Sequence, residues 1–425
     1  MRRDISSEKM LHEDKDRRMS SSPEQTTEKE ARIDMRDCSV LLAVDSFKGS
    51  ASSSRVESLI EQGIRRIVPS ARILKFPIAD GGEGTVEAIV SARGGKLRRV
   101  CARGPLGETV EARYGIVEES TAIVEMAETS GITLIEQTPR NALSASSWGV
   151  GQIIIDAIEA GCKRILIGLG GSATSDGGMG MAKALGIEFL DSARRPVPCG
   201  LEGMRTLASI DVGGLDPRIA ETEFTILTDV DNPLTGQNGA LRVYGPQKGI
   251  EPSEIETLDG WMSSFAALLE TTVGKRVQDR PGAGAAGGLG AALMAFCDAR
   301  VERGIDYVLD AIELEDAMAD VDLVITGEGR IDAQSANGKA PVGVAARAKR
   351  RGKPVIAIAG GRGDDIETVY AAGIDLVLPT VPRTMGLDEA IARVDIDVPA
   401  AGETAMRAFL LSLPQVGTSI PPRVR

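Results

Sequence analysis

The chain has 425 residues, and its 49 Lys and Arg against 61 Asp and Glu give a formal net charge of −12 at pH 7. This length is enough for about two or three domains with large cores. The acidic balance argues against a general binder of nucleic acid or of anionic membranes, because both ligands are negatively charged. The single histidine, His12, excludes histidine-rich zinc sites and leaves most acid–base chemistry to carboxylates or lysines.

The two ends of the chain differ from its body. Residues 1–35 carry many charges and few branched or aromatic side chains, so we predict a disordered tail that buries too little apolar area to offset its ordering entropy. We also expect residues 411–425 to form a loose C-terminal tail. The five cysteines are scattered and form no C-x-x-C pair, which favours a reducing compartment. Because no secretory signal or membrane-length apolar run is visible, we expect a cytoplasmic protein.

Strands and helices alternate at the start of the body and then give way to hairpins. An amphipathic helix is expected after the first strand, with Val56, Leu59, Ile60, Ile64 and Ile67 on one face and Pro69 ending it, and further helices are expected over 85–92 and 150–160. The turn at 104–107 (GPLG) indicates antiparallel pairing of the strands around it. Ser253 and Glu256 predict a capping box at a helix start. The predicted strands are 39–45, 73–78, 97–102, 110–117, 121–126, 164–168 and 224–228.

Alternating strands and helices return toward the C-terminus. The predicted elements there are a helix over 289–297, a strand over 323–326, a helix over 342–350, a strand over 355–359, a helix over 364–371 and a strand over 376–379. Such βα units at both ends imply a parallel sheet. We therefore predict an α/β protein with two α/β domains around a cleft. One is Rossmann-like, with a parallel sheet built from residues 36–85 and 285–410, and the other is a mixed domain inserted over 86–284.

Much of the glycine lies in five loops that follow predicted strands. They are 45–50 (DSFKGS), 80–85 (DGGEGT), 170–178 (GGSATSDGG), 229–232 (DVDN) and 327–332 (GEGRID). Ligands of open α/β sheets bind beyond the carboxyl ends of the strands. Amides freed by glycine, hydroxyls, carboxylates and a few cations suit a phosphorylated ligand with a divalent metal. Any one loop can be only a tight turn, but together the five predict a site.

Neither of two common nucleotide-binding motifs occurs in its full context. No Walker A sequence occurs, because none of the Gly-Lys pairs is followed by Ser or Thr. Residues 282–287 (GAGAAG) match G-x-G-x-x-G, but the residues before them are polar and not strand-like. We therefore interpret this segment as a Gly/Ala loop that enters a close-packed helix and touches a phosphate.

Seven ordered segments resemble the bacterial, type-1 glycerate kinase family, and the similarity runs from about Val40 to Met406. They are DSFKGS (45–50), ADGGEGT (79–85), IGLGGSATSDGG (167–178), TDVDNPL (228–234), GPQKG (245–249), PGAGAAGGLG (281–290) and TGEGRID (326–332). Two positions depart from the family pattern. Asn337 stands where histidine is frequent, which removes a titratable group there, and Ala51 stands where leucine is usual.

The resemblance implies transfer of the γ-phosphoryl group of ATP to D-glycerate with Mg²⁺, most often giving 2-phosphoglycerate. It also implies two α/β domains around a cleft. The 3-phosphate as product, the choice between monomer and homodimer, and the pathway stay open. No nucleic acid or membrane partner is expected.

Phosphoryl transfer depends mainly on positioning and charge neutralisation, and we assign candidate residues on that basis. Asp45, Asp229 or Asp231 is expected to hold Mg²⁺, and Asp176 or Asp332 to accept the hydroxyl proton. Lys48 is expected to face phosphates, and Arg330 to grip the glycerate carboxylate through two bonds. Each carboxylate can instead be a helix cap or turn residue. The expected substrate- and phosphate-binding residues are Ser46, Gly49, Asp80, Gly82, Glu83, Gly171, Ser172, Thr174, Gly284, Gly287 and Glu328.

Two other functions stay open. A dinucleotide-dependent dehydrogenase of a small hydroxy acid would rest on the 282–287 loop and would bind NADH. A non-catalytic nucleotide or sugar-acid binding protein would bind its ligand without releasing ADP. A coupled ADP assay with D-glycerate separates these functions.

Overall fold

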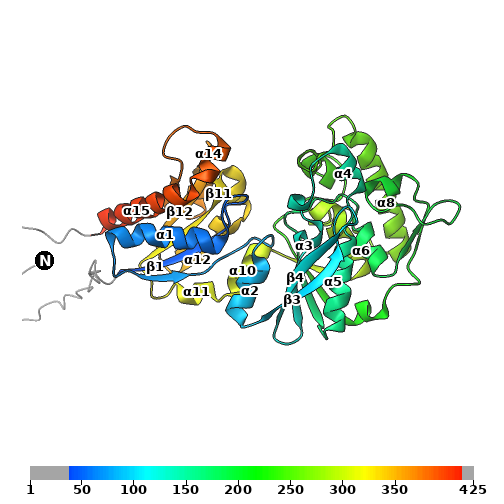
Figure 1. The fold of residues 1–425 in the computed structure, drawn as a ribbon, viewed down its shortest axis with the longest axis horizontal. Helices are drawn as coiled ribbons and strands as arrows, with labels where there is room; N and C mark the ends of the chain where they lie inside the picture. Colours follow the sequence, from blue (N-terminus) through cyan, green and yellow to red (C-terminus); the bar gives the residue numbers. More distant parts are fainter. Residues whose placement is uncertain (1–37, 414–425) are drawn as a thin grey trace, which may run out of the picture. The chain divides into compact units, whose positions relative to one another are not determined.

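A computed structural model describes residues 38–413 and contains two main sheets (Figure 1). The first, sheet A, has five parallel strands in the order β13-β12-β11-β1-β2. Their bounds are β1 Ser39–Val44, β2 Arg72–Lys75, β11 Leu323–Ile331, β12 Val355–Arg362 and β13 Leu376–Pro379. Leu41 of β1 pairs with Leu74 on one side and with Val324 on the other. A parallel sheet built from both ends of the chain is therefore confirmed.

Helices pack on both faces of sheet A. On one face, α1 (Ser53–Ile67) lies along α15 (Val394–Ser412), as Figure 1 shows. On the other, Leu41 and Ala43 of β1 share a hydrophobic core with Val344 of α12. The helices around this core and at the end of the sheet are α2 Thr85–Arg93, α10 Gly304–Ala311, α11 Leu314–Ala317, α12 Ala340–Arg350, α13 Glu367–Ala371 and α14 Leu387–Ala392.

The contact between α1 and α15 depends on two glycines inside the helices. A Cβ atom on Gly63 would lie 2.0 Å from the carbonyl oxygen of Pro399, and one on Gly402 would lie 2.7 Å from that of Ile60. Distances below 3.0 Å leave no room for a carbon atom, so the two backbones approach each other more closely than any side chain would permit. Gly63 therefore serves helix packing, although glycine weakens an isolated helix.

The second main sheet, called the mixed sheet, has six strands in the order β10-β9-β6-β5-β4-β3. Their bounds are β3 Lys96–Arg103, β4 Thr109–Val117, β5 Thr121–Glu125, β6 Arg164–Gly168, β9 Glu223–Leu227 and β10 Arg300–Glu302. The β3–β4 and β4–β5 pairs are antiparallel, as the turn signals predict, and the remaining pairs are parallel. A small antiparallel pair, β7 Glu188–Leu190 with β8 Ser209–Asp211, lies outside this sheet.

The core of the mixed sheet contains few aromatic rings but many aliphatic side chains. Three of the seven phenylalanines meet there, with Phe189 6.4 Å from Phe265 and 6.3 Å from Phe296 between ring centroids. Ile165 and Ile167 of β6 belong to the same core. Its helices are α3 Ala127–Ser130, α4 Pro139–Ser144, α5 Trp148–Glu159, α6 Met179–Ala184, α7 Ala240–Tyr244, α8 Ile255–Val273 and α9 Leu289–Phe296.

Two elements that follow residue 285 associate with the mixed sheet. Helix α9 is buried in the core of that sheet, and β10 pairs with β9. The boundary at 284/285 stays a prediction, and these contacts favour one near residue 302. The sequence does not reveal this, because α9 is apolar on every side and β10 is a short polar strand (RVE).

Smaller differences concern element ends. Strand β11 continues to Ile331, so most of the predicted 327–332 loop is a strand end that pairs with β12. The predicted capping box at Ser253 is wrong, because α8 begins at Ile255 and the side chain of its N-cap residue, Glu254, makes no capping bond. Residues 411 and 412 belong to α15, whereas the predicted tails over 1–35 and 414–425 lie outside the described residues.

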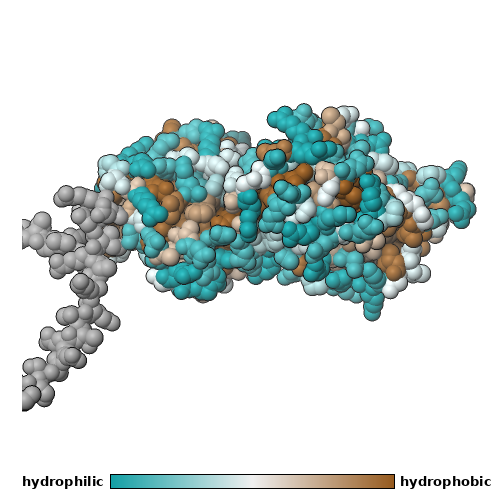
Figure 2. Space-filling view, turned by 90° about the horizontal axis from the view of Figure 1, so that it is seen from below, coloured by the Kyte–Doolittle hydropathy of each residue, from teal (hydrophilic) through white to brown (hydrophobic). Residues whose placement is uncertain are grey.

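Hydrophilic side chains cover most of the face drawn in Figure 2, and hydrophobic ones form scattered patches among them. Within residues 38–413, no helix has the length and apolar character needed to cross a membrane.

Candidate functional site

Loops from both sheets meet at the carboxyl ends of their strands through direct backbone contact. The amide of Gly170 donates to the carbonyl of Gly81 at 3.3 Å, and a Cβ on Gly170 would lie 2.5 Å from the Cα of Gly82. A Cβ on Gly304 would likewise lie 2.5 Å from the carbonyl oxygen of Asp80. Glycine at these positions therefore allows the loops to pack against one another. Gly82 is part of this packing rather than a ligand contact.

A cavity of about 370 Å³, called the loop cavity, opens beside these contacts. Its volume lies within the range of about 300–1,000 Å³ that is usual for small-molecule sites. Backbone at Gly171 and apolar side chains form part of its wall. Its polar and charged side chains are Lys48, Asp80, Ser172, Thr228, Asp229, Tyr244, Gln247 and Lys248. The predicted residues Lys48, Asp80, Gly171, Ser172 and Asp229 are thus brought together.

Two carboxylates of the loop cavity interact electrostatically. Burial and, secondarily, the charge of Asp80 raise the pKa of Asp229 to about 7. Asp229 Oδ1 is buried without a hydrogen-bond partner, and the Arg303 guanidinium approaches it with Nε at 3.8 Å. Asp80 Oδ2 lies 3.6 Å from Lys48 Nζ, and this carboxylate is the main cause of the raised pKa of Lys48. The pair therefore offers negatively charged oxygen to a cation inside the cavity.

The predicted metal-binding set is only partly brought together. Asp231 is exposed and does not line the loop cavity, so its assignment stays a prediction that the cavity does not support. Asp45 is 3% exposed at the end of β1, and burial followed by the charge of Asp80 raises its pKa well above the usual range. Among residues 38–413, no three Asp, Glu, Cys or His side chains form a group that could hold a metal ion. Mg²⁺ usually takes only one or two carboxylates along with phosphate oxygens, so Asp80 and Asp229 suit it.

Lys248 is the main site residue absent from the predicted set. It is 4% exposed, and its Nζ donates to Ser172 Oγ at 2.8 Å and to the carbonyl oxygen of Thr174 at 2.7 Å. Burial lowers the pKa of Lys248 to about 7. A lone lysine is usually a solvated surface charge, so the sequence alone does not mark Lys248 as a site residue. The available signal was its place between Gly245 and Gly249 in the GPQKG segment.

The contacts of Asp176 favour a structural role over the predicted role as proton acceptor. It is fully buried, and its carboxylate accepts hydrogen bonds from the Ser147 amide and hydroxyl and from the amides of Gly178 and Gly180, all at 2.8–3.0 Å. Burial raises its pKa despite these bonds. The carboxylate therefore joins the starts of α5 and α6, and a substrate hydroxyl has no access to it.

The residues at the end of β11 form their own network beside the site. Arg330 is 73% exposed and its Nε lies 3.1 Å from Asp332 Oδ2, and neither residue lines the loop cavity. Glu328 is buried, accepts a bond from Ser335 Oγ at 2.6 Å and lies 3.8 Å from Lys339 Nζ. Asp332 as proton acceptor and Glu328 as ligand contact therefore lack support from the cavity.

The remaining predicted residues have other positions. Ser46 and Glu83 line a different cavity, and Gly49 is exposed. A Cβ on Gly287 would lie 2.1 Å from the carbonyl oxygen of the buried Thr174, and one on Gly284 would lie 2.3 Å from that of Pro233. Both glycines therefore pack against other loops, whereas Ala285 and Ala286 of the same 282–287 segment line the loop cavity.

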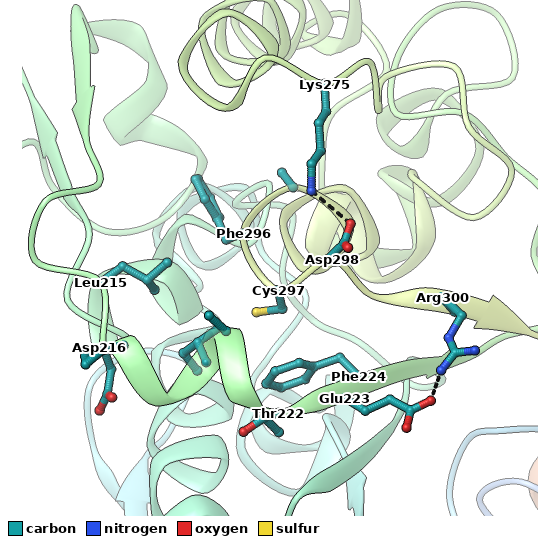
Figure 3. A pocket seen from close by; sticks show the side chains of 14 residues that line it. Leu215, Asp216, Thr222, Glu223, Phe224, Lys275, Phe296, Cys297, Asp298 and Arg300 are labelled. Carbon is teal, nitrogen blue, oxygen red and sulfur yellow. Dashed lines mark hydrogen bonds and ion pairs between the residues drawn. The ribbon is translucent and has the colours of Figure 1, made fainter.

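Another cavity at the mixed sheet, about 520 Å³, lies at the opposite ends of β9 and β10 (Figure 3). Four of its charged side chains form two ion pairs, Lys275 with Asp298 and Arg300 with Glu223. Burial raises the pKa of Cys297 to about 12, which leaves its thiol unreactive. None of the five glycine loops contributes to this cavity, so it lacks the features of the predicted site.

Comparison with known proteins identifies the family of this chain. Residues 40–410 match the glycerate kinase family. The glycerate kinase of Halalkalibacterium halodurans is 47% identical over 84% of this chain and 94% of its own length, and the glycerate 2-kinase of Escherichia coli is 47% identical over 83% and 92%. A crystal structure from Salmonella typhimurium LT2, of a protein assigned as glycerate kinase 2, superposes with a TM-score of 0.72 at 44% identity, covering 88% of this chain and 99% of that one. The chain therefore belongs to the glycerate kinase family and is a kinase.

Proposed function

We propose that this enzyme transfers the γ-phosphoryl group of ATP to D-glycerate with Mg²⁺ and forms 2-phosphoglycerate. The observation that supports this most directly is the loop cavity, whose lining contains two lysines and two carboxylates. The relatives named glycerate kinase support the acceptor, and the relative named glycerate 2-kinase supports the 2-phosphate.

The residues of the loop cavity suit a reaction that depends on charge and positioning. Asp80 and Asp229 would hold Mg²⁺, which supplies charge neutralisation for the phosphates when bound. Lys48 and Lys248 offer positive charge to the phosphates and to the glycerate carboxylate. Because Lys248 is buried, each charge-assisted bond that it makes to an anion is stronger than one in water.

The test is an ADP-release assay with D-glycerate, ATP and Mg²⁺, with and without EDTA, followed by NMR of the product. We expect ADP release that requires both D-glycerate and Mg²⁺, and a single 2-phosphate product. A matched pair of variants sharpens the assay, because Asp229→Asn alters the cavity whereas Asp231→Asn alters an exposed residue of the same loop. Absence of ADP release, or equal rates for the two variants, would contradict the proposal.

A further inference from the structure

We propose that a second cavity, at the strand ends of sheet A, binds the adenosine moiety of ATP, while the loop cavity takes D-glycerate and the reacting phosphates. This inference rests on the proposed function, since it assigns subsites to the two substrates. The second cavity, called the sheet A cavity, has a volume of about 380 Å³, within the usual range for small-molecule sites.

The topology of sheet A places this cavity where ligands of open α/β sheets bind. From β1 the chain continues to β2 on one side, and the strand on the other side of β1 is β11. The gap beyond β1 and β11 is therefore a topological switch point, the usual ligand site of such sheets. Phe47 after β1, Gly329 on β11 and Gly361 on β12 all line the sheet A cavity.

The linings of the two cavities differ in chemistry. The sheet A cavity presents apolar side chains, among them Phe47, Met385 and Ile391, together with the cations Lys48 and Arg330 and no carboxylate. The loop cavity contains two carboxylates and a buried lysine. An uncharged, flat base gains free energy from apolar contact, whereas a small hydroxy acid and a metal-bound phosphate need charged partners. Because both cavities also have apolar walls, the carboxylates decide the assignment. The sheet A cavity, which has none, suits adenosine, and the loop cavity suits the reacting groups.

Lys48 connects the two cavities, because it is part of both linings. Its side chain is 65% exposed, and its Nζ approaches Asp80 Oδ2 in the loop cavity. A nucleotide whose base occupies the sheet A cavity would direct its phosphates past Lys48 toward Asp80 and Asp229. This arrangement also gives the exposed Arg330 a phosphate rather than the glycerate carboxylate as its partner.

The test fills the sheet A cavity without altering a charge. Gly361 lines the cavity, has no left-handed φ, and a Cβ built on it meets no atom within 4 Å, so the backbone accepts a side chain there. We expect Gly361→Phe to raise the KM for ATP at least about tenfold and to change the KM for D-glycerate less than about twofold. The control is Gly260→Phe, on the exposed face of α8 with equally open space, which should change neither constant.

Calorimetric binding of ADP provides a readout that does not need turnover. We expect Gly361→Phe to weaken ADP binding at least about tenfold while its circular dichroism remains that of the wild type. If Gly361→Phe unfolds, Gly386→Phe repeats the test, since Gly386 lines the same cavity and has open space. Unchanged ADP binding in a folded variant, an effect on D-glycerate alone, or no ADP binding by the wild type would overturn the inference. Failure of the proposed function would instead show as ADP binding without phosphorylation of D-glycerate.

Discussion

Replacing Lys248 by methionine tests the loop cavity most directly, because the change removes a buried charge and keeps most of the side-chain volume. The pKa of Lys248 is lowered from its ordinary 10.5 to about 7, so between these values the unfolded chain holds a proton that the folded chain has lost. Stability contributed by this group therefore rises with pH in that window. At about 1.36 kcal/mol per pKa unit, the wild type should gain roughly 2 kcal/mol relative to Lys248→Met between pH 7 and pH 9.

Activity should change as well. A hydrogen bond from a charged group contributes about 1.5–3 kcal/mol, which corresponds to a loss of about 10- to 100-fold in kcat/KM when Lys248 no longer meets an anion. The measurements are urea unfolding at pH 7, 8 and 9 and the ADP-release assay. Lys275→Met, at an exposed lysine paired with Asp298, is the control and should show neither effect. A pH-independent stability difference, or normal kcat/KM in Lys248→Met, would refute the reasoning.

Three further predictions follow from the described contacts. The Mg²⁺ concentration for half-maximal rate should rise roughly tenfold per pH unit below about 7, because protons compete with the metal for Asp229, and a constant value from pH 5.5 to 7 would contradict this. Asp176→Asn should destabilise the fold by about 1–3 kcal/mol in chemical unfolding and keep kcat within about threefold of the wild-type value. A large loss of kcat in a stable variant would instead support a catalytic role for Asp176. Gly63→Ala should destabilise the fold by about 1–3 kcal/mol, because the added methyl group would collide with the Pro399 carbonyl. Helix propensity alone predicts a gain in stability of up to about 1 kcal/mol, and the control Gly260→Ala should show that gain. A gain in stability in both variants would contradict the packing argument.

Strong local patterns made the sheet strands predictable. The apolar runs of β1 and β6 and the turn between β3 and β4 determine their elements within a short window of sequence. Strand β10 could not be found in this way, because three mostly polar residues become a strand only through pairing with β9. The place of a boundary near residue 285 depends on the same pairing, which the local sequence does not show.

The candidate site was predictable as a set of loops but not as a set of roles. The glycine loops lie at strand ends as expected, and Lys48, Asp80 and Asp229 line one cavity. Asp176 and Lys248 show what the sequence leaves open, since the chemistry of each depends on burial by distant segments. Four donors enclose the carboxylate of the first, and the 170–178 loop accepts hydrogen bonds from the buried amino group of the second.

The construction of sheet A from both ends of the chain has a consequence for synthesis on the ribosome. The amide of Ser39, at the start of β1, donates to Asp322 Oδ2 at 2.8 Å across 283 positions of sequence. At about 5–20 residues per second, β1 waits roughly 15 to 60 s for its neighbour β11 to be made. During that time the backbone N–H and C=O groups on one side of the apolar strand β1 have no partner strand, and such an exposed edge promotes aggregation. We therefore expect nascent chains that end before β11 to need chaperones more than the finished enzyme does.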